Sequence, residues 1–332
     1  MKIKYISMVL LTGLISLSAC KKLTDGLDVN PNQPTDAPAD LQLNGTEVAS
    51  ILVYEGNLAR IGGIFSNSFS GSDRQYVEYE NYNSNAPDYD DAWDILYGNV
   101  ISNAKIGEMK ATELNNKLQM GIFQVIQAQA FGTAASLWGD VPFTEASSSE
   151  FATPQFEAQA DVYAKVQTLL DNAIANLSSG VGSGTSKDIF FSSDAAKWVA
   201  TAYTLKARYF LHTKNYALAI AAAQQGILNP ANNMMAPHGN TYNSDFNVYY
   251  SFTVYDRPVY LTADGAYNPM LLDASTSVYK GNAKTNEGAR LNYLYQEDIY
   301  VGGLELNSLS ADFDGSGPDD TGFFGSDAKF PL

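Results

Sequence analysis

The sequence predicts an all-α protein, a scaffold of repeated helices with a long irregular region packed on it. Apolar residues recur at helical spacing in several stretches between about residues 90 and 230. From about residue 231 to residue 332 this periodicity is short or absent. The chain has 332 residues, of which 45% are apolar, so it is long enough to bury a sizeable core.

The first 19 residues are typical of a lipoprotein signal peptide. Two lysines precede Ile6–Ala19, an apolar run of 14 residues that is too short to cross a bilayer. The run ends in Leu17-Ser18-Ala19-Cys20, which resembles a bacterial lipobox. Because Cys20 is the only cysteine of the chain, we expect it to be lipidated and to anchor the protein without a transmembrane span. An ordinary signal peptide is the alternative.

A tether and a first helix follow the signal peptide. Residues 20–45 are polar and rich in Pro, Asn and Asp, which predicts a tether, and residues 46–332 predict a single α-helical domain. A helix is expected over Leu41–Arg60. Its expected apolar face comprises Val48, Ile51, Leu52 and Ala59. Residues 66–92, in which tyrosines alternate with amide and acidic side chains, fit no period and predict a long loop.

Three further helices are expected before residue 178. An apolar stripe from Trp93 to Ala104 predicts the first, and helices over about 115–138 and 156–177 come next. Gly139 suits the end of the middle helix. We expect Trp138 to anchor that helix end by packing there.

The stretch Asp194–Pro230 predicts two helices joined by a tight turn at Thr213-Lys214-Asn215. Ala207 and Ala219 would let the two helices cross closely, with aromatic side chains beside them. This pattern is similar to a tetratricopeptide repeat, whose period is about 34 residues. Because one such unit cannot bury its own apolar face, other helix pairs must stack on it.

The composition argues against several kinds of chemistry. A net charge of −16 disfavours nucleic acid as a partner. The chain has two histidines and no HExxH, CxxC or GxSxG, so we expect no metal site and no cofactor. The 36 acidic residues leave a paired-carboxylate glycosidase open. Asp312–Gly317 loosely resembles the start of a calcium loop, but position twelve is Phe323, so a solvated acidic turn is preferred.

The tyrosine-rich and amide-rich stretches indicate sugar binding. An aromatic ring packs on the C–H face of a sugar, while neighbouring polar side chains pair with its hydroxyl groups. For any single tyrosine, packing of a loop on the scaffold is the alternative. The candidate ligand-binding residues are Arg74, Tyr76, Tyr79, Asn81, Tyr82, Tyr249 and Tyr250.

Together, these features resemble the SusD/RagB family of outer-membrane lipoproteins of the Bacteroidetes type. The resemblance covers most of residues 17–230 and thins afterwards. The motifs that carry it are Leu17-Ser18-Ala19-Cys20, Val29-Asn30-Pro31-Asn32, Trp93–Ile101 with Asn103, Leu137-Trp138-Gly139-Asp140-Val141-Pro142-Phe143, and the helix pair at 194–230.

The resemblance implies a fold of tetratricopeptide-like units whose irregular region carries the ligand site. It implies a binding protein and not an enzyme, lipid-anchored in the outer membrane and exposed at the cell surface. Such proteins capture oligosaccharides and deliver them to a SusC-like TonB-dependent outer-membrane barrel. Peptide capture for import and a structural helical-repeat scaffold are the alternatives. Family members are usually longer, with a helical segment after the position of Leu332, so C-terminal truncation is one interpretation of this chain.

Overall fold

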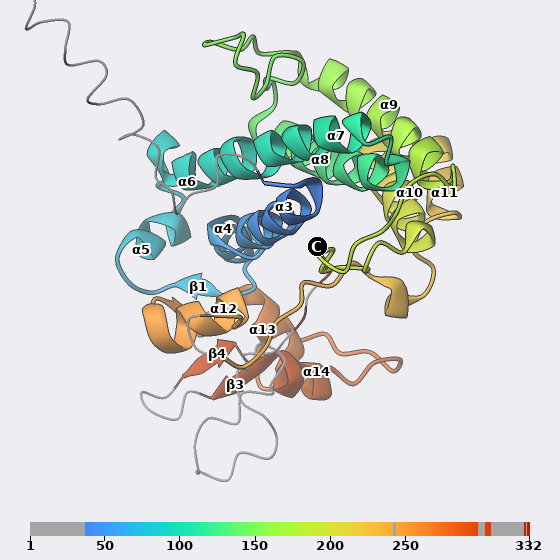
Figure 1. Cartoon of the computed structure of the whole chain (residues 1–332). Helices are drawn as coiled ribbons and strands as arrows, with labels where there is room; N and C mark the ends of the chain where they lie inside the picture. Colours follow the sequence, from blue (N-terminus) through green and yellow to red (C-terminus); the bar gives the residue numbers. More distant parts are fainter. Residues whose placement is uncertain (1–36, 242–243, 298–302, 307–328, 330) are drawn as a thin grey trace, which may run out of the picture. The chain divides into compact units, whose positions relative to one another are not determined.

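The computed structural model describes residues 37–241, 244–297, 303–306, 329 and 331–332 (Figure 1). Residues from Ala39 to Leu332 belong to one unit. The lipobox cysteine Cys20, the motif at Val29–Asn32 and the acidic turn at Asp312–Gly317 lie outside the described residues. Within the described part of the chain, none of the helices has both the length and the apolar character that a membrane span needs.

The scaffold consists of helices that follow one another along the chain, and each packs on the next. They are α6 (Asp90–Asp94), η2 (Ile95–Ile101), α7 (Ser102–Glu113), α8 (Lys117–Trp138), α9 (Gln159–Leu177), α10 (Ala195–His212) and α11 (Tyr216–Ala223). The predicted all-α repeat scaffold is therefore confirmed, and the turn at 213–215 joins α10 to α11 as expected. The second helix of this pair is shorter than predicted, because it ends at Ala223 and not near Pro230.

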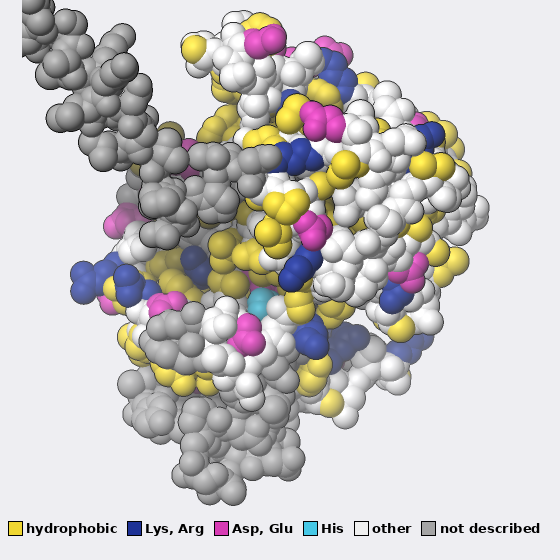
Figure 2. Space-filling model, in the orientation of Figure 1, with side chains coloured by type: hydrophobic (Ala, Val, Ile, Leu, Met, Phe, Trp, Pro, Cys, Tyr) yellow, Lys and Arg dark blue, Asp and Glu magenta, His cyan; other side chains and the backbone are white. Residues whose placement is uncertain are grey.

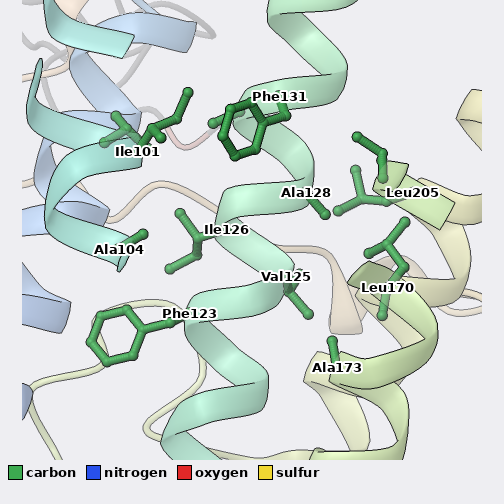
Figure 3. Close-up of a cluster of buried hydrophobic side chains, with 14 of the residues drawn as sticks. Ile101, Ala104, Phe123, Val125, Ile126, Ala128, Phe131, Leu170, Ala173 and Leu205 are labelled. Atoms are coloured by element: carbon green, nitrogen blue, oxygen red, sulfur yellow. The ribbon is translucent and has the colours of Figure 1, made fainter. Parts of the chain in front are cut away.

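Helix α8 lies at the centre of the main core (Figure 3). Phe123 and Ile126 point toward the η2–α7 side, whereas Val125 and Ala128 point toward α9 and α10. All four side chains are buried. Small residues of α8 admit a neighbouring helix. At Gly132, an added Cβ would lie only 2.1 Å from the ring of Tyr209 on α10.

A buried acidic pair joins α3 (Ala39–Tyr54) to the segment before α10. Glu47 on α3 is 0% exposed and Asp188 is 1% exposed. Asp188 accepts hydrogen bonds from the backbone nitrogens of Phe190, Phe191 and Ser193. It also accepts one from Nε1 of Trp198 at 2.7 Å. Burial, together with the negative charge of Asp188, raises the pKa of Glu47 to about 10, so Glu47 is protonated at neutral pH.

The first predicted helix is two helices, because α3 ends at Tyr54 and α4 covers Asn57–Phe65. The predicted apolar face is wrong in part, since Val48 and Leu52 are 44% and 49% exposed. The side chains that α3 buries include the polar residues Thr46, Glu47 and Ser50. Hydropathy alone therefore does not mark the inner face of this helix.

Residues 66–92 are not one long loop, and that prediction is wrong. They contain β1 (Ser70–Gly71), α5 (Gln75–Glu80) and the 3₁₀ turn η1 (Ala86–Tyr89). Tyr76 and Tyr79, one turn apart on α5, are 2% and 4% exposed. These two tyrosines form the inner face of a short helix whose outer face is polar. The sequence does not reveal this helix, because six residues are too few to show a helical period of apolar residues.

The region after residue 231 consists of brief helices and short strands, as predicted. Its elements, with the turn that precedes them, are η3 (Pro230–Asn232), α12 (Val248–Tyr250), η4 (Ser251–Asp256), β2 (Leu261–Thr262), α13 (Tyr267–Leu272), α14 (Glu287–Leu294), β3 (Tyr295–Glu297) and β4 (Leu304–Leu306). Antiparallel pairs form between β1 and β2 and between β3 and β4. A second core cluster fastens this region to α4 and α5. It includes Ile61, Ile64, Phe69, Tyr76, Tyr79, Phe252, Leu261, Tyr295 and Leu306.

Trp138 ends α8 and lies edge-on to Trp93, with 5.2 Å between the ring centroids. The indole is half-buried and not fully enclosed. We therefore expect Trp138→Ala to lower the free energy of unfolding by about 1–3 kcal/mol, less than the 3–5 kcal/mol typical of a fully buried tryptophan. Urea denaturation measures the loss. Leu137→Ala, whose side chain is 54% exposed, should change stability little, and an equal loss in both variants would contradict the anchoring role.

Candidate functional site

A pocket of about 570 Å³ lies where α4, α5, η1 with α6, and η4 meet. This volume falls within the range of about 300–1,000 Å³ that is usual for ligand sites. Its lining comprises Asn57, Arg60, Gln75, Tyr76, Tyr79, Pro87, Asp88, Asp91, Phe252, Asp256 and Arg257. The pocket therefore combines aromatic rings with amide, acidic and basic groups.

The aromatic residues form the floor of the pocket, since Tyr76, Tyr79 and Phe252 are all buried. The ring of Tyr76 lies edge-on to Tyr79 at 5.5 Å and to Phe252 at 5.4 Å. Asp91 and Arg257 at the rim are exposed. An apolar floor with a polar rim suits a ligand that has both a C–H face and hydroxyl groups.

A chain of hydrogen bonds fixes the polar groups around the floor. Nε of Arg60 donates to the Tyr76 hydroxyl at 2.9 Å, and that hydroxyl donates to Oδ1 of Asn57 at 3.3 Å. Nδ2 of Asn57 in turn donates to the backbone oxygen of Asp88 at 3.3 Å. The guanidinium carbon of Arg60 lies 4.2 Å from the centre of the Phe252 ring. Because these groups hold one another in place, a ligand meets a site that is already ordered.

The hydroxyl of Tyr79 stays protonated at neutral pH. Burial and the negative charge of Asp88 raise the pKa of Tyr79 to about 12, although a hydrogen bond with Asn57 acts in the opposite direction. The hydroxyl is therefore able to donate a hydrogen bond to a ligand. None of the described lining residues is a histidine, cysteine or serine. Within the described residues, no three His, Cys, Asp or Glu side chains are grouped so as to hold a metal ion.

Only Tyr76 and Tyr79 of the predicted ligand-binding residues line this pocket. Arg74, immediately before α5, has a side chain that is 71% exposed and lies 4.0 Å from the carboxylate of Asp73. Asn81 follows α5 and donates from Nδ2 to the backbone oxygen of Val77.

The other predicted tyrosines are not among the residues that line the pocket. Tyr82 is 68% exposed, has a backbone φ of 55°, and stacks on Phe65 with 5.3 Å between the ring centroids. In α12, Tyr250 is buried, whereas Tyr249 is half-buried and edge-on to Phe69. Tyr249 packs against the second core cluster, which contains Tyr76 and Tyr79, but does not line the pocket.

Several lining residues were missed by sequence reasoning, chiefly Asn57, Arg60, Asp88 and Phe252. Asn57 and Arg60 lie one helical turn apart at the end of the stretch that the sequence predicts as a first helix. A polar pair at that spacing on an otherwise apolar helix is the signal that could have indicated them. For Phe252, no local signal was present, because tertiary packing brings it to the pocket.

The surface face drawn in Figure 2 carries acidic and basic side chains dispersed among apolar ones. The described residues on this face show no continuous basic stripe. This distribution agrees with the net charge of −16 and offers no footprint for a phosphate backbone.

Comparisons with solved structures identify the fold. Similar structures include a SusD/RagB family protein from Bacteroides thetaiotaomicron, with 20% identity and a TM-score of 0.62 over 71% of this chain and 51% of that one. A chitin-binding protein matches at 20% identity and a TM-score of 0.63, over 78% of this chain and 55% of that one. A SusD homolog from Parabacteroides distasonis matches at 16% identity and 0.61, over 80% and 57%. The chain thus spans about half the length of these structures.

No curated protein matches the chain in sequence. A SusD-like family, described as "Starch-binding associating with outer membrane", matches residues 54–261. This match covers more than half of the 332 residues and contains every residue that lines the pocket. On that evidence, the chain belongs to the SusD-like family.

Proposed function

We propose that the protein is a nutrient-binding lipoprotein of the outer membrane that captures an oligosaccharide in the pocket between α4, α5 and η4. The observation that carries the proposal is the aromatic floor of Tyr76, Tyr79 and Phe252, bordered by polar groups, within the segment matched by the family. The family description, starch binding in association with the outer membrane, supports the same function.

The geometry suits a pyranose ring. The C–H face of the sugar would rest on the aromatic floor, and the guanidinium of Arg60 would donate hydrogen bonds to its oxygens. The carboxylates of Asp88 and Asp91 would accept hydrogen bonds from its hydroxyl groups. The pocket needs both hydrogen-bond donors and acceptors, because each sugar hydroxyl donates one hydrogen bond and accepts others. The protein would then hand its ligand to a SusC-like TonB-dependent barrel, with the lipid on Cys20 holding it at the cell surface.

Calorimetry with starch-derived and chitin-derived oligosaccharides and other glycans tests the proposal. Asp91→Ala is expected to weaken binding by at least about tenfold, about 1.4 kcal/mol, because it removes a charged hydrogen-bond acceptor from the rim. Asp90→Ala is the matched control. Both residues are exposed in the first turn of α6, but only Asp91 lines the pocket.

Other outcomes would replace the proposal. Binding of peptides without any glycan would favour a peptide importer, and release of shortened sugars would favour the glycosidase. Copurification from outer membranes separates capture from scaffolding, because a capture protein should bring down one large barrel and a scaffold should bring down soluble partners.

A further inference from the structure

We propose that Arg60 makes the pocket selective for a glycan that carries a carboxylate, such as a uronic acid unit, within an otherwise neutral chain. This inference rests on the proposed glycan-binding function and names the ligand class of the same pocket. It depends on the position of one cation on the pocket floor.

Arg60 is a half-buried cation without an anionic partner in the described part of the protein. The ion pairs found there involve Arg74, Lys165, Lys206, His238 and Arg290, and none brings a carboxylate within 4.0 Å of Arg60. The net charge of the chain is −16, so acidic groups are in excess over basic ones. Removing a charge from water without a partner is unfavourable, and a ligand anion would relieve that cost.

The contacts of Arg60 leave one side of its guanidinium available. Phe252 covers a face of the group at 4.2 Å, and Nε is occupied by the Tyr76 hydroxyl. The two terminal nitrogens have no hydrogen-bond partner among the described residues, and Arg60 lines the pocket. A planar pair of donors held in this way matches the two oxygens of a carboxylate.

The rim of the pocket limits how acidic the ligand can be. Asp91 and Asp256 are exposed there, and Asp88 lies half-buried beside the floor. These carboxylates would repel a polyanion, but they would accept hydrogen bonds from the hydroxyl groups of neutral sugar units. The structure therefore favours one acidic unit at Arg60 with neutral units around it.

Matched pairs of ligands test the inference. Suitable pairs are a xylo-oligosaccharide with and without a glucuronic acid branch, an oligogalacturonide and its methyl ester, and sialyllactose and lactose. Calorimetry should show at least one acidic member binding about tenfold or more tighter than its neutral partner. Arg60→Met should abolish that preference, so that the acidic and the neutral member of the pair bind with affinities within about twofold of each other. Arg290→Met, on α14 and outside the pocket lining, should keep the preference.

Arg60→Lys guards against misfolding of the methionine variant, because it retains the charge and loses the planar fork. It should lower the preference for the acidic ligand, and an unchanged preference would overturn the role of the fork. Equal or tighter binding of the neutral partner by the unmodified protein would overturn the inference and leave the proposed function intact. Absence of binding to every glycan would overturn both.

Discussion

Replacement of Trp198 with alanine is expected to lower the free energy of unfolding by about 3–5 kcal/mol. The indole is 0% exposed and packs edge-on to Phe191 at 5.2 Å between the ring centroids. The substitution leaves a cavity between α10 and the segment before it, and it removes a hydrogen-bond donor from the buried carboxylate of Asp188. Urea denaturation followed by circular dichroism measures this loss.

Trp198→Phe separates the two parts of that effect. Phenylalanine fills much of the space but leaves Asp188 without its Nε1 donor, which should cost about 1–3 kcal/mol. A loss below about 1 kcal/mol for Trp198→Ala would show that this region contributes little to global stability. Equal losses in the two variants would assign the whole effect to the hydrogen bond.

The second large effect is a pH dependence that originates at Glu47. The pKa of this side chain rises from the ordinary 4.5 to about 10 in the folded protein, chiefly because the group is buried and secondly because Asp188 lies beside it. Between these two values the folded state binds more protons at Glu47 than the unfolded state does. The contribution of Glu47 to stability is therefore fully present below pH 4.5 and decreases as pH rises toward 10.

Glu47→Gln should reduce this dependence, because an amide does not titrate and keeps an oxygen that can accept from the backbone nitrogen of Ile189. We expect the stability of the variant relative to the unmodified protein to increase by about 1.4 kcal/mol per pH unit within that window. Denaturation at a series of pH values measures the slope. Glu113→Gln, at an exposed position at the end of α7, should leave the slope as it is. An unchanged slope in Glu47→Gln would contradict a buried, protonated Glu47.

The scaffold was predictable where burial and hydropathy coincide. In η2 and α7 the stripe through Leu96, Val100, Ile101 and Ala104 is fully buried, as the spacing indicates. The same reasoning failed for α3, where Thr46 and Glu47 are buried. Thr46 donates to the backbone oxygen of Gln42 one turn earlier, and Glu47 accepts from the backbone nitrogen of the distant Ile189. It also does not anticipate the buried glutamines of α8, such as Gln124, which donates to Glu108 on α7 at 2.6 Å.

The pocket was predictable only in part. Tyrosines between residues 66 and 92 indicated a sugar site, and two of them, Tyr76 and Tyr79, line the pocket. Their partners come from elsewhere in the chain. Arg60 belongs to an earlier helix and Phe252 to η4, and no local period connects them. Contacts between distant parts of the chain bring these side chains together. The spacing of residues in a single sequence does not predict such contacts.

The pocket lies between the helices that precede the scaffold and the irregular region, since α4 and α5 supply one wall and η4 supplies another. A bound sugar would thus add to the contacts between these two parts of the molecule, which include the second core cluster and the short β1–β2 pair. A ligand at about one hundred times its dissociation constant stabilises the state that binds it by about 2.7 kcal/mol. Any opening that separates the two walls would then cost this additional free energy. Ligand binding would then appear as slower hydrogen exchange of backbone amides around η4.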